Sequence, residues 1–260
     1  MRLLLVFSML ALAVSCSDSD KGFDMEPVYP VLNAGQIGEK LLSAYEAGSE
    51  TRLQEILDYW SNEVHPNSVA DINRSNNYDV YQVFELLYNP FSYSIIGNSY
   101  LDAVNRKLEY IVIQNTVYFD YNYYFDSENT KDSITGFCPP VSIANVKPLY
   151  HTPSYREAIG NFLGTGTYIS GKNELDAETV LSEEQLNRLA FLNKKLAIFP
   201  ASKGNGWYIE THPYISTIHF DNNKEKAFVI VRIGDTNGEA LLEKENGNWK
   251  VISLQSGINW

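Results

Sequence analysis

The sequence contains little cysteine, which cross-links small secreted domains, and few of the basic residues that bind nucleic acid. Only two of its 260 residues are cysteine, Cys16 and Cys138. Cys16 lies near the start of the chain, before the part expected to fold, so Cys138 has no disulfide partner within that part and stability must come from a hydrophobic core. Lysine and arginine number 20 against 32 acidic residues, a net charge of −12. Because neutralising phosphates requires a basic surface, this balance argues against a nucleic-acid partner and against charge-driven binding to an anionic membrane.

Long apolar runs are also missing, since none reaches the roughly 20 residues that a membrane-spanning helix requires. The longest stands at the start of the chain, where Arg2 precedes an apolar stretch over residues 3–14 and small residues lie before Cys16. A positive charge, a short apolar run and a small-residue cleavage site are the pattern of a secretory signal peptide. Residues 1–15 are therefore expected to be a signal peptide.

The residues around Cys16 resemble a bacterial lipobox. Ala13-Val14-Ser15-Cys16 has the small residues of that motif, in which the cysteine is lipidated and becomes the mature N-terminus, and the acidic tract 17–20 is similar to that of surface lipoproteins of the Bacteroidota. The resemblance implies an outer-membrane lipoprotein, exposed at the cell surface and held only by acyl chains on Cys16. An ordinary signal peptide with an incidental Cys16 is the alternative. Residues 16–33, which contain Ser, Asp, Gly and Pro, are expected to form a flexible tether.

Helical periodicity follows the tether. Ile37, Leu41 and Tyr45 share one face and predict a helix over 36–47 that ends at Gly48. The same spacing predicts helices over residues 53–64 and 80–88. The opening part of the chain is thus expected to be a helical layer.

The apolar period changes to two after this layer. Residues 110–123 alternate apolar and polar side chains and predict one long half-buried strand in an antiparallel sheet. Further strands are predicted over 133–137 and 144–150. A helix with Thr152 as cap and Pro153 at its first position is expected to end at Gly164.

The end of the chain has the signals of an antiparallel meander. Ser182 and Gln185 form a capping box that begins a helix reaching Leu196. Strands are then expected over residues 195–199, 207–211, 215–221, 227–233, 239–245 and 248–254. Asn246-Gly247 predicts a type I′ hairpin turn. Its register sets Glu243 opposite Lys250 as an ion pair, Leu242 opposite Val251, and Lys244 opposite Trp249.

These elements predict an α+β fold, with an N-terminal helical layer followed by a large curved antiparallel sheet and short helices. The closing block 238–251 resembles the end of a cystatin-like or nuclear-transport-factor-like domain, which implies a curved sheet wrapped around a helix. Residues 136–164 resemble a segment of uncharacterised secreted Bacteroidota lipoproteins, a resemblance that implies no activity. The expected regions are 34–150 and 151–260, either as two subdomains joined near residue 150 or as one domain.

Histidines and acids offer one candidate cluster, made of Glu210, His212, His219 and Asp221. On strands, the first two share a face and so do the last two, and a site assembles if the strands are neighbours. Chance spacing is the simpler interpretation, and no metal or other cofactor is expected. The loop 164–171 lacks the Lys-Ser/Thr pair of a phosphate loop, and no Gly-x-Ser-x-Gly elbow occurs. We assign no catalytic residue, and Cys138 is expected to be a buried, inert thiol.

Two functions remain open. Anchored proteins of this type often handle glycans, and a secreted hydrolase acting on glycan or peptide would need two carboxylates about 5–10 Å apart, for which Glu210 and Asp221 are the first candidates. The sequence favours instead a non-catalytic binding or structural module with a glycan, peptide or protein ligand, because 18 Tyr, 12 Phe and 4 Trp supply rings that stack on ligands. Sheet packing uses the same residues. The candidate ligand-binding side chains are Tyr118, Tyr124, Trp207 and Tyr208.

One modification site is also suggested. Asp132-Ser133-Ile134 resembles the acceptor for protein O-glycosylation in the Bacteroidota, with Ser133 as the acceptor.

Overall fold

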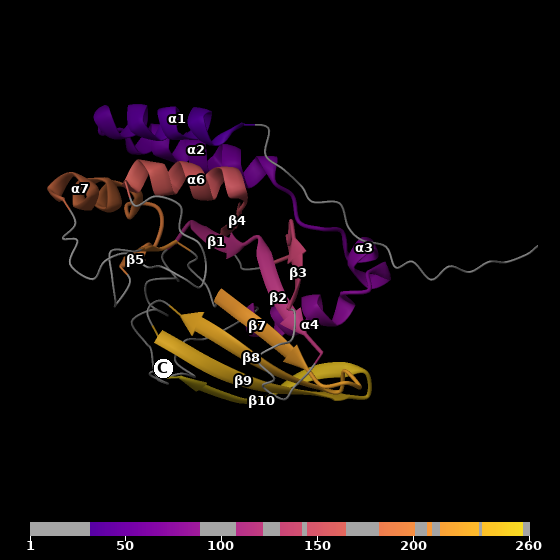
Figure 1. Ribbon diagram of the computed structural model, residues 1–260. Coiled ribbons are helices and arrows are strands. Elements are labelled where there is room, and N and C mark those ends of the chain that lie inside the picture. Colours follow the sequence, from indigo (N-terminus) through magenta and orange to yellow (C-terminus); the bar gives the residue numbers. More distant parts are fainter. Residues whose placement is uncertain are drawn as a thin grey trace, which may run out of the picture.

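Helices at the front of the chain precede a sheet in this α+β protein (Figure 1). The computed structural model describes residues 32–88, 108–121, 131–141, 145–164, 182–200, 207–209, 214–233 and 236–256. Among these residues, no helix combines the length and the apolar character needed to cross a membrane.

The front helices begin and end where local sequence signals place them. They are α1 (Ala34–Glu46), α2 (Glu50–Glu63), α3 (Val69–Arg74) and α4 (Tyr78–Tyr88). The side chain of Asn33 accepts the amide proton of Gln36, whose own side chain accepts from Asn33, and this reciprocal cap starts α1. Gly48 follows α1 with a positive φ of 58°. The predicted helices are confirmed, and α3, which the sequence analysis did not anticipate, is capped by Ser68.

Two later helices pack in the same layer. α6 (Pro153–Leu163) lies against α1, and α7 (Glu183–Leu192) contacts α6. The predicted capping box at Ser182 is present, but α7 ends before Leu196. Thr152 occupies the predicted cap position of α6 without making a side-chain capping bond. Gly164 ends α6 in the left-handed conformation, at φ 71°.

The prediction of one long strand over 110–123 was wrong, because the chain changes sheets at Asn115. β1 (Tyr110–Gln114) pairs in parallel with β4 (Lys147–His151) in a sheet of their own. β2 (Thr116–Asp120) belongs to the larger sheet. Asn115 is buried at the break and exchanges hydrogen bonds with Phe137: its side chain donates to the Phe137 carbonyl at 3.2 Å, and its carbonyl accepts the Phe137 amide at 3.0 Å. These bonds replace a continuous strand ladder at this point.

The larger sheet has the strand order β10-β9-β8-β7-β2-β3. Its other strands are β3 (Asp132–Thr135), β7 (Tyr214–Phe220), β8 (Lys226–Ile233), β9 (Thr236–Glu245) and β10 (Asn248–Ser256). The predicted meander β7–β10 is antiparallel, as expected. The sheet as a whole is mixed, because β2 joins β7 in parallel. β5 (Phe199–Pro200) and β6 (Trp207–Tyr208) form a separate short pair, so the strand predicted over 195–199 begins only at its last residue.

The Asn246-Gly247 hairpin has the predicted register. Both turn residues have positive φ, 53° and 80°, as a type I′ turn requires. Lys244 lies opposite Trp249 with its ammonium 4.9 Å from the ring centroid, and the other two predicted pairs are also in register. The expected ion pair is not formed. Lys250 contacts Glu245 instead, and Glu243 pairs with Lys226 of the neighbouring strand at 3.1 Å.

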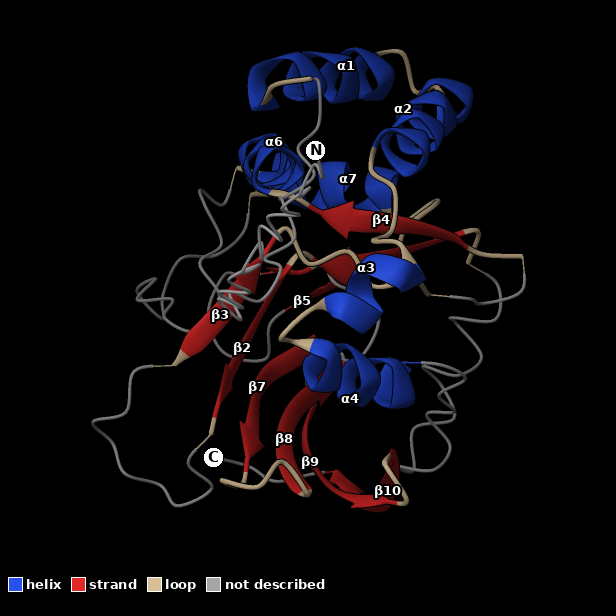
Figure 2. Ribbon diagram, turned by 90° about the vertical axis from the view of Figure 1, so that its right-hand side faces the viewer, coloured by secondary structure: helices blue, strands red, loops and turns tan. Residues whose placement is uncertain are grey.

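One face of the larger sheet packs on helix α4, which lies in front of β7–β10 in Figure 2. Trp249 donates from its indole nitrogen to Asp79 Oδ1 at 2.8 Å, and Lys244 pairs with the same oxygen at 2.8 Å. Ile218, Phe220 and other apolar side chains of this face belong to a core that continues into the helical layer. This core contains residues from both sides of position 150, where the boundary between two subdomains stays a prediction.

Candidate functional site

The opposite face of the larger sheet carries a row of polar and aromatic side chains. Register pairs Asp120 with His219, and His219 with Phe228. Residues directly opposite each other in neighbouring strands share a face, and alternate residues of one strand do too. Tyr118 and Thr217 therefore lie on the same face as His219. We call this the outer face, in contrast to the face that packs on α4.

Asp120 and His219 form a hydrogen-bonded pair on the outer face. The ring Nδ1 of His219 lies 2.8 Å from Oδ2 of Asp120, and the two side chains are 15% and 11% exposed. The parallel pairing of β2 and β7 places their Cα atoms side by side. A carboxylate at Nδ1 fixes the ring orientation and favours the tautomer with a proton on that nitrogen. The pair is thus held in place and is mostly buried, with only a small part of each side chain exposed.

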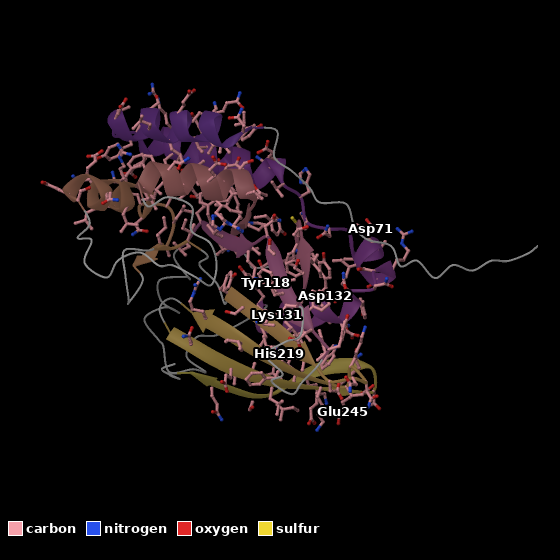
Figure 3. The ribbon with its side chains drawn as sticks, viewed as in Figure 1. Asp71, Tyr118, Lys131, Asp132, His219 and Glu245 are labelled. Atoms are coloured by element: carbon pink, nitrogen blue, oxygen red, sulfur yellow. The ribbon has the colours of Figure 1, made fainter. Side chains whose placement is uncertain are left out.

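Lys131 adds a positive charge to this face. It lies immediately before β3, and its ammonium reaches across β2 to donate to Thr217 Oγ1 at 3.1 Å. Thr217 is buried, and its hydroxyl donates in turn to the carbonyl of Ser216 at 2.7 Å. This hydroxyl is therefore engaged both as an acceptor, from Lys131, and as a donor, to Ser216. Figure 3 shows Lys131 between Tyr118 and His219.

Tyr118 and Ser133 are neighbours on the outer face, because β2 pairs with β3 and sets them directly opposite each other. Tyr118 is half-buried, and Ser133 is exposed on the short edge strand β3. A glycan attached to Ser133 would lie beside the ring of Tyr118. The structure thus brings together three of the residues singled out from the sequence: Tyr118, Ser133 and His219.

Most of the other predicted residues lie outside the part of the chain that the structure describes. Cys16, Tyr124, Glu210 and His212 lie outside the described residues, and so do the side chains of Trp207 and Tyr208, whose backbone forms β6. Asp221 is described and has a local role. Its Oδ1 accepts the backbone amides of Glu225 and Lys226 at 2.7 and 2.9 Å, which fastens the turn between β7 and β8.

Asp120 and Lys131 were not among the candidate site residues predicted from the sequence. Asp120 is one of the polar residues of the alternating segment, so its face of the strand could be predicted from the sequence, but its partner could not. His219 pairs with a residue 99 positions away, through a parallel contact of only two residue pairs. Lys131 had no signal in the sequence.

The described residues contain no group of three His, Cys, Asp or Glu side chains that could hold a metal ion. On the outer face, Asp120 and His219 supply two such groups, and a stable site needs at least three protein ligands.

Cys138 is buried and structural. Burial raises the pKa of its thiol to about 12, and Asn115 donates a hydrogen bond to its sulfur at 3.3 Å. A thiol that stays protonated at neutral pH is a poor nucleophile. The prediction that Cys138 is a buried thiol is confirmed.

Comparisons of the chain with family models, curated proteins and solved structures found no significant match.

Proposed function

We propose that this chain is a lipid-anchored protein of the cell envelope, displayed at the outer-membrane surface of a bacterium of the Bacteroidota type. Residues 1–15 have the organisation of a signal peptide, and Cys16 follows small residues as in a lipobox. The tether after Cys16 gives way to the first described helix at Ala34. Acyl chains on Cys16 supply the membrane affinity, and the folded part faces water.

We further propose that the folded part is a non-catalytic module that binds a ligand on the outer face. The observation that supports this is the contrast between the two faces of one sheet. The inner face is largely apolar and packs on α4, whereas the outer face carries the Tyr118 ring, the Asp120–His219 pair and the Lys131 ammonium. These groups offer donors, acceptors and a ring on rigid strands, which reduces the entropy lost on binding.

A hydrolase is the second candidate, because a carboxylate-oriented histidine such as His219 is able to act as a general base. The surrounding groups favour binding instead. The hydroxyl of Thr217 is engaged both as donor and as acceptor, so it is not poised to serve as a nucleophile. Asp221, one of the two carboxylates considered for glycoside hydrolysis, is committed to a turn.

A glycan and peptide array probed with the full chain in detergent tests this proposal. Tyr118→Ala is expected to weaken the signal of at least one bound array ligand roughly tenfold, because truncating an aromatic ring of a binding surface removes a large part of its contact energy. Tyr78→Ala is the matched control, since Tyr78 is an exposed tyrosine of α4. An unchanged signal in Tyr118→Ala contradicts binding at the outer face. Recovery of cleaved ligand by mass spectrometry supports the hydrolase.

A further inference from the structure

A second concave surface lies between α1 and α2, in the helical layer. The groove has a volume of about 640 Å³, within the range of small-ligand sites. Ile37, Ile56 and Tyr155 form its apolar part. In Figure 1 these helices lie at the opposite end of the molecule from β7–β10, so the groove is separate from the outer face.

The aromatic platform of the groove is the exposed ring of Tyr59, which is held in place before any ligand binds by its contact with Glu63 and, through it, with the buried Tyr155. Tyr59 is 42% exposed, and its hydroxyl donates to Glu63 Oε1 at 3.2 Å. Tyr155 donates to the other oxygen of Glu63 at 3.0 Å. The ring of Tyr155 stacks on Trp60 at 4.0 Å between centroids, with 5° between the planes. One carboxylate therefore orients two tyrosines along the groove.

Both tyrosines remain protonated and able to donate. Burial raises the pKa of Tyr155, and the negative charge of Glu63 raises it further. The same two causes raise the pKa of Tyr59. The hydrogen bonds that fix the platform therefore persist throughout the neutral pH range.

The rim of the groove carries four charged side chains that do not contribute ion pairs or hydrogen bonds to the described part of the fold. Glu39 and Lys40 come from α1, and Arg52 and Glu55 come from α2. Their side chains make no ion pair or hydrogen bond to the residues that the structure describes. Two positive and two negative charges sum to zero. The rim thus offers free donors and acceptors without a net charge.

We propose that this groove binds a neutral oligosaccharide. The exposed Tyr59 ring presents a flat apolar surface for one face of a pyranose. Carboxylates and a guanidinium are planar groups that hydrogen-bond adjacent hydroxyls in pairs. The zero net charge of the rim offers no preference for an anionic or cationic ligand. This site is independent of the ligand proposed for the outer face.

The full chain in detergent, applied to an array of neutral glucans, mannans and chitooligosaccharides beside uronate-containing and sulfated glycans, tests the proposal. The wild type is expected to retain neutral glycans, and Tyr59→Ala to weaken this binding roughly tenfold. Tyr59→Phe keeps the ring and is expected to lose less than about threefold. Tyr78→Ala is expected to leave the binding unchanged. A glycan whose binding depends on Tyr59 and not on Tyr118 is assigned to the groove, and one whose binding depends on Tyr118 and not on Tyr59 is assigned to the outer face.

Charge substitution completes the test. Glu55→Gln keeps hydrogen-bonding atoms and removes one charge, so affinity for a neutral glycan is expected to change less than about threefold and to persist at high salt. Retention of acidic glycans only, loss of binding at high salt, or equal binding by wild type and Tyr59→Ala overturns the proposal. Because Tyr59 is exposed, thermal unfolding of Tyr59→Ala is expected to match the wild type within a few degrees.

Discussion

Replacing Trp60 by alanine is expected to lower the free energy of unfolding by about 3–5 kcal/mol, the usual cost of truncating a large buried aromatic residue. Trp60 is 1% exposed and joins α2 to the strands beneath it. Its indole nitrogen donates to the carbonyl of Tyr150 in β4 at 2.8 Å, and its ring stacks on Tyr155 of α6. The alanine variant loses packing against two elements and leaves a buried carbonyl without its donor.

Urea unfolding followed by circular dichroism measures this effect. Trp60→Phe refills most of the volume but cannot donate to Tyr150, so it is expected to cost about 1–3 kcal/mol. Tyr59→Ala, at the neighbouring exposed position, is expected to stay within about 0.5 kcal/mol of the wild type. A loss below about 1 kcal/mol in Trp60→Ala would show that α2 does not depend on this contact.

The second large effect is expected from Gln114→Leu, with a loss of about 2–4 kcal/mol. Gln114 is buried at the point where the chain leaves β1 for β2. Its side-chain oxygen accepts the amide of Ile215 at 2.6 Å, and its nitrogen donates to the carbonyls of Ile215 and Thr116 at 2.9 and 2.8 Å. The side chain thus extends the short ladder between β2 and β7. Leucine has a similar size and leaves these backbone groups buried and unpaired.

The same substitution should also weaken binding at the outer face, because the β2–β7 contact sets Asp120 beside His219. Gln255→Leu, at an exposed position of β10, is the matched control and is expected to change stability by less than about 0.5 kcal/mol. Equal urea midpoints for Gln114→Leu and Gln255→Leu would contradict the role given to Gln114.

Local signals in the sequence were sufficient to predict most of the helices and one hairpin. The spacing of Ile37, Leu41 and Tyr45 predicted α1, because a helix repeats every 3.6 residues whatever it packs against. Asn246-Gly247 predicted a register because few residue pairs adopt two successive positive φ values. The contact of Lys244 with Trp249 followed from that register.

Contacts between segments that lie far apart in the sequence could not be predicted from it. The prediction of one strand over residues 110–123 missed a change of sheet, because the hydrogen bonds that Asn115 makes with Phe137 and Cys138 have no signal in the local sequence. β2 and β7 pair in parallel and are not joined by a short turn, so no turn residues in the sequence predict their pairing. For that reason His219 was found as a candidate while its partner Asp120 was not. The aromatic platform of the groove depends likewise on Glu63 and Tyr155, which lie 92 positions apart.

The proposed location at the cell surface, and the kind of ligand expected there, depend on lipidation of Cys16. Mass spectrometry of the mature protein, extracted from the membranes of a bacterium that processes lipoproteins, tests it most directly. We predict a chain that begins at Cys16 with a diacylglyceryl group on its sulfur, and we predict that Cys16→Ala carries no lipid and leaves the membrane fraction. A mature chain that begins at another residue, or an unmodified Cys16, would contradict the account.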